Sequence, residues 1–142
     1  MTFKRPESVL VIVYTKDAQV LMLERSQPCG FWQSVTGSLH EGESAMDAAH
    51  RELKEETGLS GDIVATGIEN TFPIIEAWRS RYSPDVSENH ETVFALQIES
   101  VVEVQLCSDE HVTQCWLPRE QAAVKASSWT NRDAILALVP KG

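Results

Sequence analysis

Short apolar runs separated by polar turns mark the predicted strands of this chain. Residues 8–15 and 20–23 are rich in β-branched side chains and flank a brief polar turn, which predicts two adjacent strands buried in a sheet. Residues 91–98 alternate apolar and polar side chains, which indicates a strand with one buried face. Four shorter runs predict further strands: 62–67, 68–72, 101–106 and 112–117.

Residues 74–82 alternate apolar and polar side chains less regularly than these strands do. If they form a strand, Arg79 and Arg81 share one face, because side chains two residues apart point the same way.

Three helices are predicted from their end signals. Residues 45–56 contain neither Gly nor Pro, Ser44 with Asp47 reads as a capping box, and Gly58 suits a left-handed C-cap. Pro at the first turn favours a second helix over 118–125. The last helix is predicted over 133–139, with a capping box formed by Thr130 and Asp133.

Length and charge limit the possible functions. The 142 residues are enough for one domain, 1–142, with a proper core. The net charge of −9 makes nucleic acid an unsuitable partner, because no basic face is available to neutralise its phosphates. A small polyphosphate is still possible if metal ions and a few placed cations meet it, since long-range repulsion is screened within about 10 Å.

The cysteines and the first residues indicate the compartment. Cys29, Cys107 and Cys115 are an odd number without CxxC spacing, which predicts reduced thiols instead of a disulfide framework or a zinc site. The apolar run 9–13 is too short for a signal peptide or a membrane span. A cytoplasmic protein is therefore expected.

Helix 45–56 places acidic and apolar residues on the same side. Drawn at about 100° per residue, one arc of about 160° holds both kinds: Ala45, Ala48, Ala49, Glu52, Leu53, Glu55 and Glu56. A charge run is usually interpreted as a solvated acidic face. That interpretation does not fit here, because the acidic and the apolar residues lie on the same side of the helix. Arg51 and Lys54 fall on the other side of the helix, so no Lys or Arg is expected among these carboxylates. Carboxylates on a packing face repel one another unless a cation joins them. Oxygen ligands without His or Cys select a hard ion, so Mg²⁺ or Mn²⁺ is expected.

The same stretch carries a pattern of fixed spacing: Gly37, five residues, Glu43, seven residues, Arg51-Glu52-Leu53, one residue, Glu55-Glu56, one residue, Gly58-Leu59. The pattern resembles the Nudix box, which belongs to a family that hydrolyses diphosphates linked to another group. The resemblance implies an α/β fold, the Nudix α/β/α sandwich with a mixed β-sheet. The box helix would cover one face of the sheet and the C-terminal helices the other.

The resemblance also assigns roles to the box residues. The family's catalytic metal ligands correspond to three carboxylates: Glu52, Glu55 and Glu56. The Gly37 carbonyl corresponds to a further ligand. Arg51, the remaining catalytic candidate, is expected to pair with Glu43 and to brace the loop on the helix.

Residues 32–38, WQSVTGS, depart from the Pro-Gly-Gly that commonly precedes the box and resemble the Nudix subgroup that hydrolyses dihydroneopterin triphosphate. Lys4-Arg5-Pro6 and the string SWTNR at 128–132 carry the same resemblance. On this basis four residues are expected to bind substrate: Lys4, Arg25, Thr36 and Ser128. The resemblance also implies a further metal-binding carboxylate at Glu110.

Each of these residues has an ordinary alternative. Arg25 is either an exposed cation at a strand end or a side chain that leans into the same cleft as the box. Thr36 could simply finish a strand, Glu110 could be a solvated loop acid, and Lys4 could lie in a frayed terminus. The bulky stretch 72–75 either touches substrate, as in the subgroup, or belongs to the core.

The expected function is Mg²⁺-dependent hydrolysis of dihydroneopterin triphosphate to its monophosphate and pyrophosphate, a step of folate synthesis. The alternative enzyme is a general nucleoside triphosphate pyrophosphatase that cleans the nucleotide pool. A module that only senses nucleotide would be free to lose box carboxylates, and this chain keeps all of them. The expected partner is a small polyphosphate, with no nucleic acid, membrane or obligatory protein partner.

Overall fold

The computed structural model describes residues 3–106 and 111–141 of the chain. In chain order the elements are β1 (Glu7–Thr15), β2 (Gln19–Arg25), β3 (Trp32–Gln33), β4 (Val35–Ser38), α1 (Ala45–Thr57), β5 (Val64–Pro73), the 3₁₀ helix η1 (Glu76–Arg81), β6 (Glu88–Ile98), β7 (His111–Pro118), α2 (Arg119–Lys125) and α3 (Trp129–Leu138).

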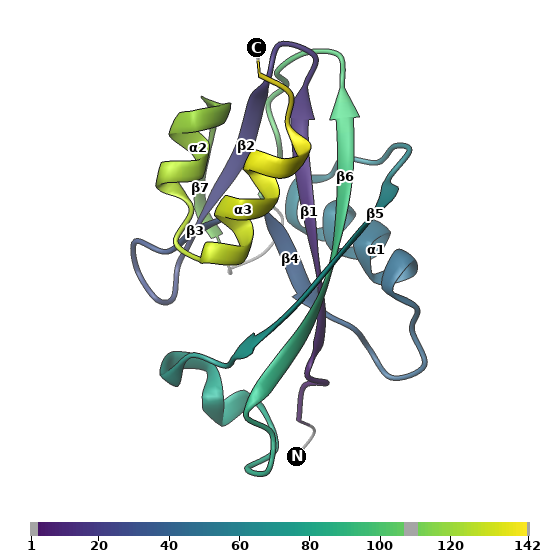
Figure 1. Ribbon diagram of the computed structural model, residues 1–142, viewed down its shortest axis with the longest axis vertical. Coiled ribbons are helices and arrows are strands. Elements are labelled where there is room, and N and C mark those ends of the chain that lie inside the picture. The colour runs from purple at the N-terminus through teal and green to yellow at the C-terminus, as the bar shows by residue number, and fades with distance from the viewer. Residues whose placement is uncertain (1–2, 107–110, 142) are drawn as a thin grey trace.

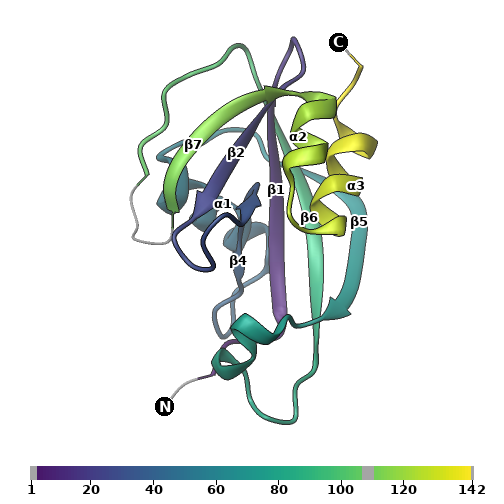
Figure 2. The same ribbon diagram turned by 90° about the vertical axis from the view of Figure 1, so that its left-hand side faces the viewer.

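A mixed sheet, seven-stranded within the described residues, lies between α1 on one face and the pair α2 and α3 on the other (Figures 1 and 2). This arrangement confirms the expected sandwich. The positions of β1, β2, β6, β7, α1 and α2 agree with the predicted elements to within a few residues. No helix in the described ranges is long and apolar enough to cross a membrane.

Strand β1 is the centre of the sheet. One of its edges pairs in parallel with β6 along its whole length. The other edge is divided between two antiparallel partners, β4 opposite residues 8–11 and β2 opposite Tyr14. Strand β2 also pairs with β3 and β7, and β5 lies beyond β6.

Strand β1 also separates two hydrophobic cores. Val9, Val11 and Val13 pack in the core under α1, whereas Leu10 and Ile12 pack in the core under α2 and α3. All five are almost fully buried, which explains why this strand is a continuous apolar run.

The segment after α1 forms one strand where two were predicted. Residues 62–67 and 68–72 both contribute to β5, which pairs antiparallel with β6. The register shifts between Ala65 and Glu69, and Gly67 has a φ of +79° there. The glycine therefore marks a bulge inside the strand, not its end.

Segment 74–82, whose pattern left the question open, is not a strand, and segment 101–106 is not the strand that was predicted. The N–H of Ile74 bonds the Ser87 carbonyl and closes the β5–β6 ladder, after which the chain winds into η1. In the second segment, the N–H of Gln105 bonds the last carbonyl of α1 at 3.1 Å. Apolar alternation cannot distinguish such packed loops from paired strands.

Helix α3 begins one turn before the predicted range 133–139. Ser128 is its N-cap and accepts a hydrogen bond from the Asn131 N–H at 3.2 Å. The proposed capping box of Thr130 and Asp133 is therefore wrong, because both residues lie inside the helix.

Asn131 ties the first turn of α3 to the break between β3 and β4. Its Oδ1 accepts from the Ser34 N–H at 2.7 Å, and its Nδ2 donates to Ser34 Oγ at 2.9 Å. Both residues are 1% exposed, so these bonds form without competing water. The side chain satisfies a backbone donor that lies between two short strands.

We expect Asn131→Ala to lower the free energy of unfolding by about 2 kcal/mol, because a buried N–H loses its acceptor. Thermal denaturation should show a Tm lower by roughly 4–8 °C. The control is Arg132→Ala, whose half-exposed side chain pairs with the exposed Asp133 and should change stability by less than about 0.5 kcal/mol. Equal Tm values for wild type and Asn131→Ala would contradict this role.

Candidate active site

The ends of α1 fix which of its residues face the sheet. Ser44 Oγ accepts from the Asp47 N–H at 3.1 Å, and Gly58, with a φ of +77°, donates its N–H to the Lys54 carbonyl. Both predicted caps are confirmed. Ala48 and Leu53 are consequently fully buried against the sheet.

The box carboxylates divide into two buried groups and one exposed group. Glu52 is 9% exposed and Glu56 2% exposed, as their place beside the buried alanines predicts. Glu55 does not share this burial, since 54% of its side chain is exposed. Glu55 lies at the edge of the helix face that packs on the sheet, so its side chain reaches solvent.

Helix α1 makes its closest approach to the sheet at β4. A Cβ placed on Gly37 would lie 1.3 Å from Glu52 Oε2, so only glycine leaves room for this carboxylate. The N–H of Thr36 points to Glu56 Oε1 at 3.4 Å. Two carboxylates, one helical turn apart, therefore lie against consecutive residues of one strand.

Arg51 braces the loop before α1, as the resemblance implied. Its Nε and Nη2 each bond one Glu43 carboxylate oxygen at 2.9 Å, and Nη2 also bonds the Ser38 carbonyl at 3.0 Å. The hydrogen bond from Arg51 holds the pKa of Glu43 at about 2, although desolvation opposes the shift. The same hydrogen bond raises the pKa of Arg51 further above its ordinary value.

Arg51 also supplies the positive charge that the helical projection placed on the other side of α1. Its Nη1 lies 3.3 Å from Glu52 Oε1 and 3.4 Å from Glu55 Oε2. The long side chain reaches across the helix surface to its neighbours in sequence and on the next turn. The expectation that no Arg stands among the box glutamates is therefore wrong.

Two polar residues behind Glu56 were missed by the sequence analysis. His111 Nε2 lies 3.8 Å from Glu56 Oε1 and 3.0 Å from Gln33 Nε2. The His111 side chain is 1% exposed. The contact arises because β7 pairs with β2 and puts His111 opposite Arg25. No spacing in the sequence signals that pairing.

The oxygen atoms at this place fit a hard divalent cation. Glu52, Glu56 and the Gly37 carbonyl are the groups that would hold it, and none offers nitrogen or sulfur. Within residues 3–106 and 111–141, no three Asp, Glu, His or Cys side chains gather closely enough to enclose an ion. Mg²⁺ is commonly held by one or two carboxylates together with waters and substrate phosphates, which suits such an open set. Glu110 lies outside the described residues.

A cavity of about 440 Å³ opens on the other face of β4. Side chains alternate along a strand, and Thr36 pairs with Leu10, which belongs to the core under α2 and α3. Val35 packs in the core under α1 instead. Glu52 and Glu56 of α1 therefore lie against one side of β4, and the cavity opens on the other.

Three of the four predicted substrate-binding residues line this cavity: Arg25, Thr36 and Ser128. Arg25 is 8% exposed and lines the cavity, so it is not an exposed cation at a strand end. Its guanidinium lies over the Trp78 ring at 5.1 Å and its Nε donates to the Gln27 carbonyl at 2.8 Å. Lys4 is exposed and does not line the cavity, although its N–H bonds the Arg81 carbonyl beside it.

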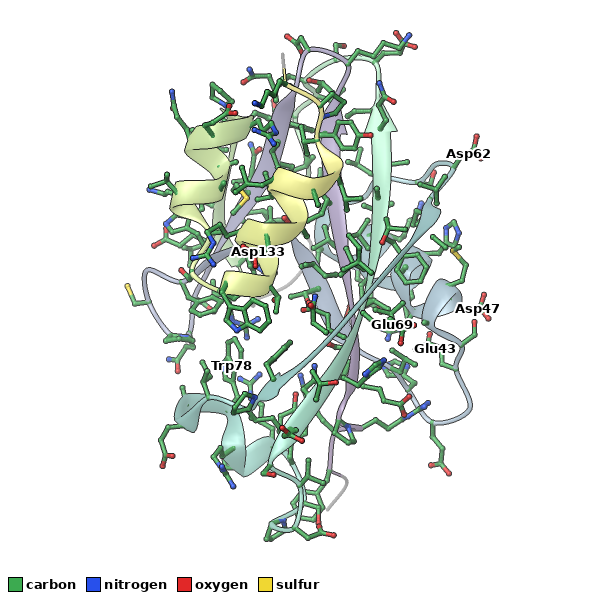
Figure 3. All side chains as sticks on the ribbon, in the orientation of Figure 1. Glu43, Asp47, Asp62, Glu69, Trp78 and Asp133 are labelled. Atoms are coloured by element: carbon green, nitrogen blue, oxygen red, sulfur yellow. The ribbon has the colours of Figure 1, made fainter. Side chains whose placement is uncertain are left out.

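Aromatic and apolar side chains form most of the cavity wall: Phe31, Phe72, Ile74, Ile75, Trp78, Tyr82 and Trp129. The whole stretch 72–75 therefore faces the cavity. Trp78 extends from η1 toward the first turn of α3 (Figure 3) and meets Phe31 edge to face at 5.2 Å. Trp129 is half exposed at the start of α3, so Asn131, not this tryptophan, anchors the helix on the sheet.

Comparisons with known proteins agree with this geometry. A family model described as the NUDIX domain matches residues 4–138. Dihydroneopterin triphosphate diphosphatase of Escherichia coli (strain K12) is 43% identical, over 94% of this chain and 91% of that protein. The Haemophilus influenzae protein of the same name is 35% identical, over 95% and 88%. The solved structure of the E. coli dihydroneopterin triphosphate pyrophosphohydrolase superposes with a TM-score of 0.92 at 39% identity, covering 98% of each chain.

We expect Gly37→Ala to impair hydrolysis while the fold survives. The new methyl group occupies the position of the Glu52 carboxylate, whose flexible side chain must turn away from β4. Because small misplacements in a site cost about a hundredfold, kcat/KM should fall by at least roughly that factor and half-saturation by Mg²⁺ should need more metal.

A matched control is Gly61→Ala, whose Cβ would lie 2.9 Å from Leu96 Cδ1, also the end of a flexible side chain but outside the site. Its activity should stay close to that of the wild type. An unchanged metal titration in Gly37→Ala would show that the close contact has no part in metal binding.

Proposed function

The chain belongs to the NUDIX family, and we propose that it is a Mg²⁺-dependent pyrophosphohydrolase that converts dihydroneopterin triphosphate to dihydroneopterin monophosphate and pyrophosphate in the cytoplasm. One observation carries the substrate assignment. A single cavity combines an aromatic wall with Arg25, Thr36 and Ser128. Strand β4 forms part of its lining, and the box carboxylate of Glu52 lies against the same strand. Relatives of that name are 43% and 35% identical to this chain and span almost all of it, which supports the same assignment.

The residues of this chain divide the reaction between them. Arg25 and the hydroxyl groups of Thr36 and Ser128 bind the phosphates or the polyol. Arg51 holds Glu52 and the loop before α1 in place. A divalent cation, when bound, supplies positive charge against the phosphate oxygens and lowers the pKa of the attacking water.

A box glutamate accepts the proton of that water as its oxygen attacks phosphorus. The water oxygen forms a new bond to phosphorus, and the bond from that phosphorus to the oxygen that bridges the first and second phosphates breaks. The bridging oxygen leaves with the other phosphate group, so the products are the monophosphate and pyrophosphate. Glu56 is suited to stay fixed during this step, because its side chain is 2% exposed and its Oε1 lies 3.4 Å from the Thr36 N and 3.8 Å from His111 Nε2.

The net charge of −9 is compatible with a triphosphate substrate. Repulsion from distant carboxylates is screened over about 10 Å, whereas Arg25 acts at short range inside the cavity. The proposed partner is therefore a small polyphosphate and not a polymer of phosphates.

Metal dependence should be visible in one isosteric variant. Glu56→Gln removes a charge and keeps the shape of a 2% exposed side chain, so the fold should survive. Turnover should fall by at least roughly a hundredfold in saturating Mg²⁺. Wild-type activity in EDTA equal to that in Mg²⁺ would contradict the proposed cofactor.

The substrate is tested by side-by-side kinetics on dihydroneopterin triphosphate, dGTP and dATP, with the products identified. A site built to bond particular hydroxyl groups rejects analogues, so kcat/KM for dihydroneopterin triphosphate should exceed both others by at least roughly tenfold. Equal or better use of a deoxynucleotide would assign the protein to the nucleoside triphosphate pyrophosphatases that clean the nucleotide pool.

A further inference from the structure

Two polar residues on β6 form the floor of the cavity. Asn89 and Glu91 are two residues apart, so their side chains lie on one face of the strand, roughly 7 Å from each other. They are 4% and 5% exposed, and both line the cavity. Nothing in the reaction described above uses them.

The Glu91 carboxylate is a buried hydrogen-bond acceptor. Among the described residues, no Lys or Arg forms a salt bridge with it. The Thr130 hydroxyl and the Asn70 amide, at 3.5 Å from Oε1, are its hydrogen-bond donors. Burial nevertheless raises its pKa above the ordinary glutamate value. A buried acid without a cation costs stability, so its presence on a cavity floor calls for a ligand that donates hydrogen bonds.

Asn89 adds a second acceptor beside it. Its Nδ2 donates to Ser8 Oγ at 2.7 Å, while its Oδ1 is buried without a hydrogen-bond partner among the residues that the structure describes. An unsatisfied buried acceptor is costly, and a ligand donor would remove that cost.

The two acceptors can distinguish heterocycles by their edges. A 2-amino-4-oxopyrimidine ring, as in pterin and guanine, offers a ring N–H and an amino group side by side, which are two adjacent donors. A carboxylate accepts on both oxygens and matches that edge in a bidentate way. The edge of adenine combines one donor with one acceptor, and its acceptor would face a carboxylate oxygen.

The walls around these acceptors suit a flat ring. Phe72, Trp78 and Tyr82 line the same cavity, and aromatic side chains stack on heterocycles. The cavity volume of about 440 Å³ is in the range of small-molecule sites. Thr36 and Gly37 of β4 line the cavity, and Glu52 of α1 lies against Gly37, so this end of the cavity is left for the phosphates.

We propose that Glu91, assisted by Asn89, determines specificity by accepting hydrogen bonds from the two adjacent donors of a 2-amino-4-oxopyrimidine ring. For the pterin substrate this proposal rests on the proposed function. For guanine nucleotides it does not, because guanine carries the same edge.

The test compares wild type, Glu91→Gln and the control Glu69→Gln, whose side chain on neighbouring β5 is 59% exposed. Each protein is assayed with dihydroneopterin triphosphate, dGTP and dATP. In Glu91→Gln one acceptor becomes a donor, so kcat/KM for the first two should fall at least roughly twentyfold, mainly through KM. With dATP it should change by less than about threefold, and Glu69→Gln should resemble the wild type throughout.

The outcomes separate this proposal from the proposed function. If wild type prefers a deoxynucleotide, the proposed function fails. A lower ratio of kcat/KM for dGTP to kcat/KM for dATP in Glu91→Gln would still support recognition of the ring by Glu91. An equal fall for dGTP and dATP, or no fall, overturns the role of Glu91. Should Glu91→Gln fail to fold, Thr130→Val removes the hydroxyl donor to Glu91. The same hydroxyl contacts Ser128 Oγ at 3.3 Å, and losing that contact affects both nucleotides alike and leaves their ratio unaltered. The ratio of dGTP to dATP should therefore fall by a smaller factor than in Glu91→Gln, and an unchanged ratio overturns the proposal.

Discussion

The contact between Gly37 and the Glu52 carboxylate is the constraint on which the site depends. Strand β4 must approach α1 so closely that no side chain fits at residue 37, since a Cβ would overlap Glu52 Oε2. That approach also brings the Thr36 N–H within reach of Glu56. Any residue larger than glycine would separate the helix carboxylates from the strand. The glycine therefore matters for the space it leaves, not for its backbone freedom.

The acidic face of α1 is stable because cations and polar groups surround it without neutralising it. Arg51 meets Glu43 and Glu52, and its hydrogen bonds to Glu43 also hold the loop that precedes the helix. Glu56 is almost completely buried against His111. Negative charge is thus concentrated where the helix packs, and the oxygens of Glu52 and Glu56 are of the kind that a hard cation favours. The overall charge of the protein contributes little to this local balance.

Local rules predicted the parts of the fold that local interactions decide. The caps of α1 and the burial of Glu52 and Glu56 follow from residue order and helical phase alone. Glu55 was predicted on the packing face but is exposed, because a helical projection does not show where the packed face ends. Residues 101–106 look like a strand but bond the end of α1 instead, and α3 starts earlier because Asn131 is held by Ser34, a residue far away in sequence. The contact of His111 with Glu56 likewise depends on the pairing of β7 with β2. Such contacts are properties of the assembled sheet, so a single sequence does not reveal them.

Chemistry and recognition occupy opposite sides of one strand, and this separation has a consequence for specificity. The carboxylates belong to α1, whereas the cavity is lined by residues of the sheet, of η1 and of the first turn of α3. Alternation along β4 joins the two sides without mixing their side chains. Residues such as Asn89 and Glu91 can therefore change without moving Glu52 or Glu56. The fold thus fixes the kind of bond that is broken, while the cavity floor selects the group to which the diphosphate is attached.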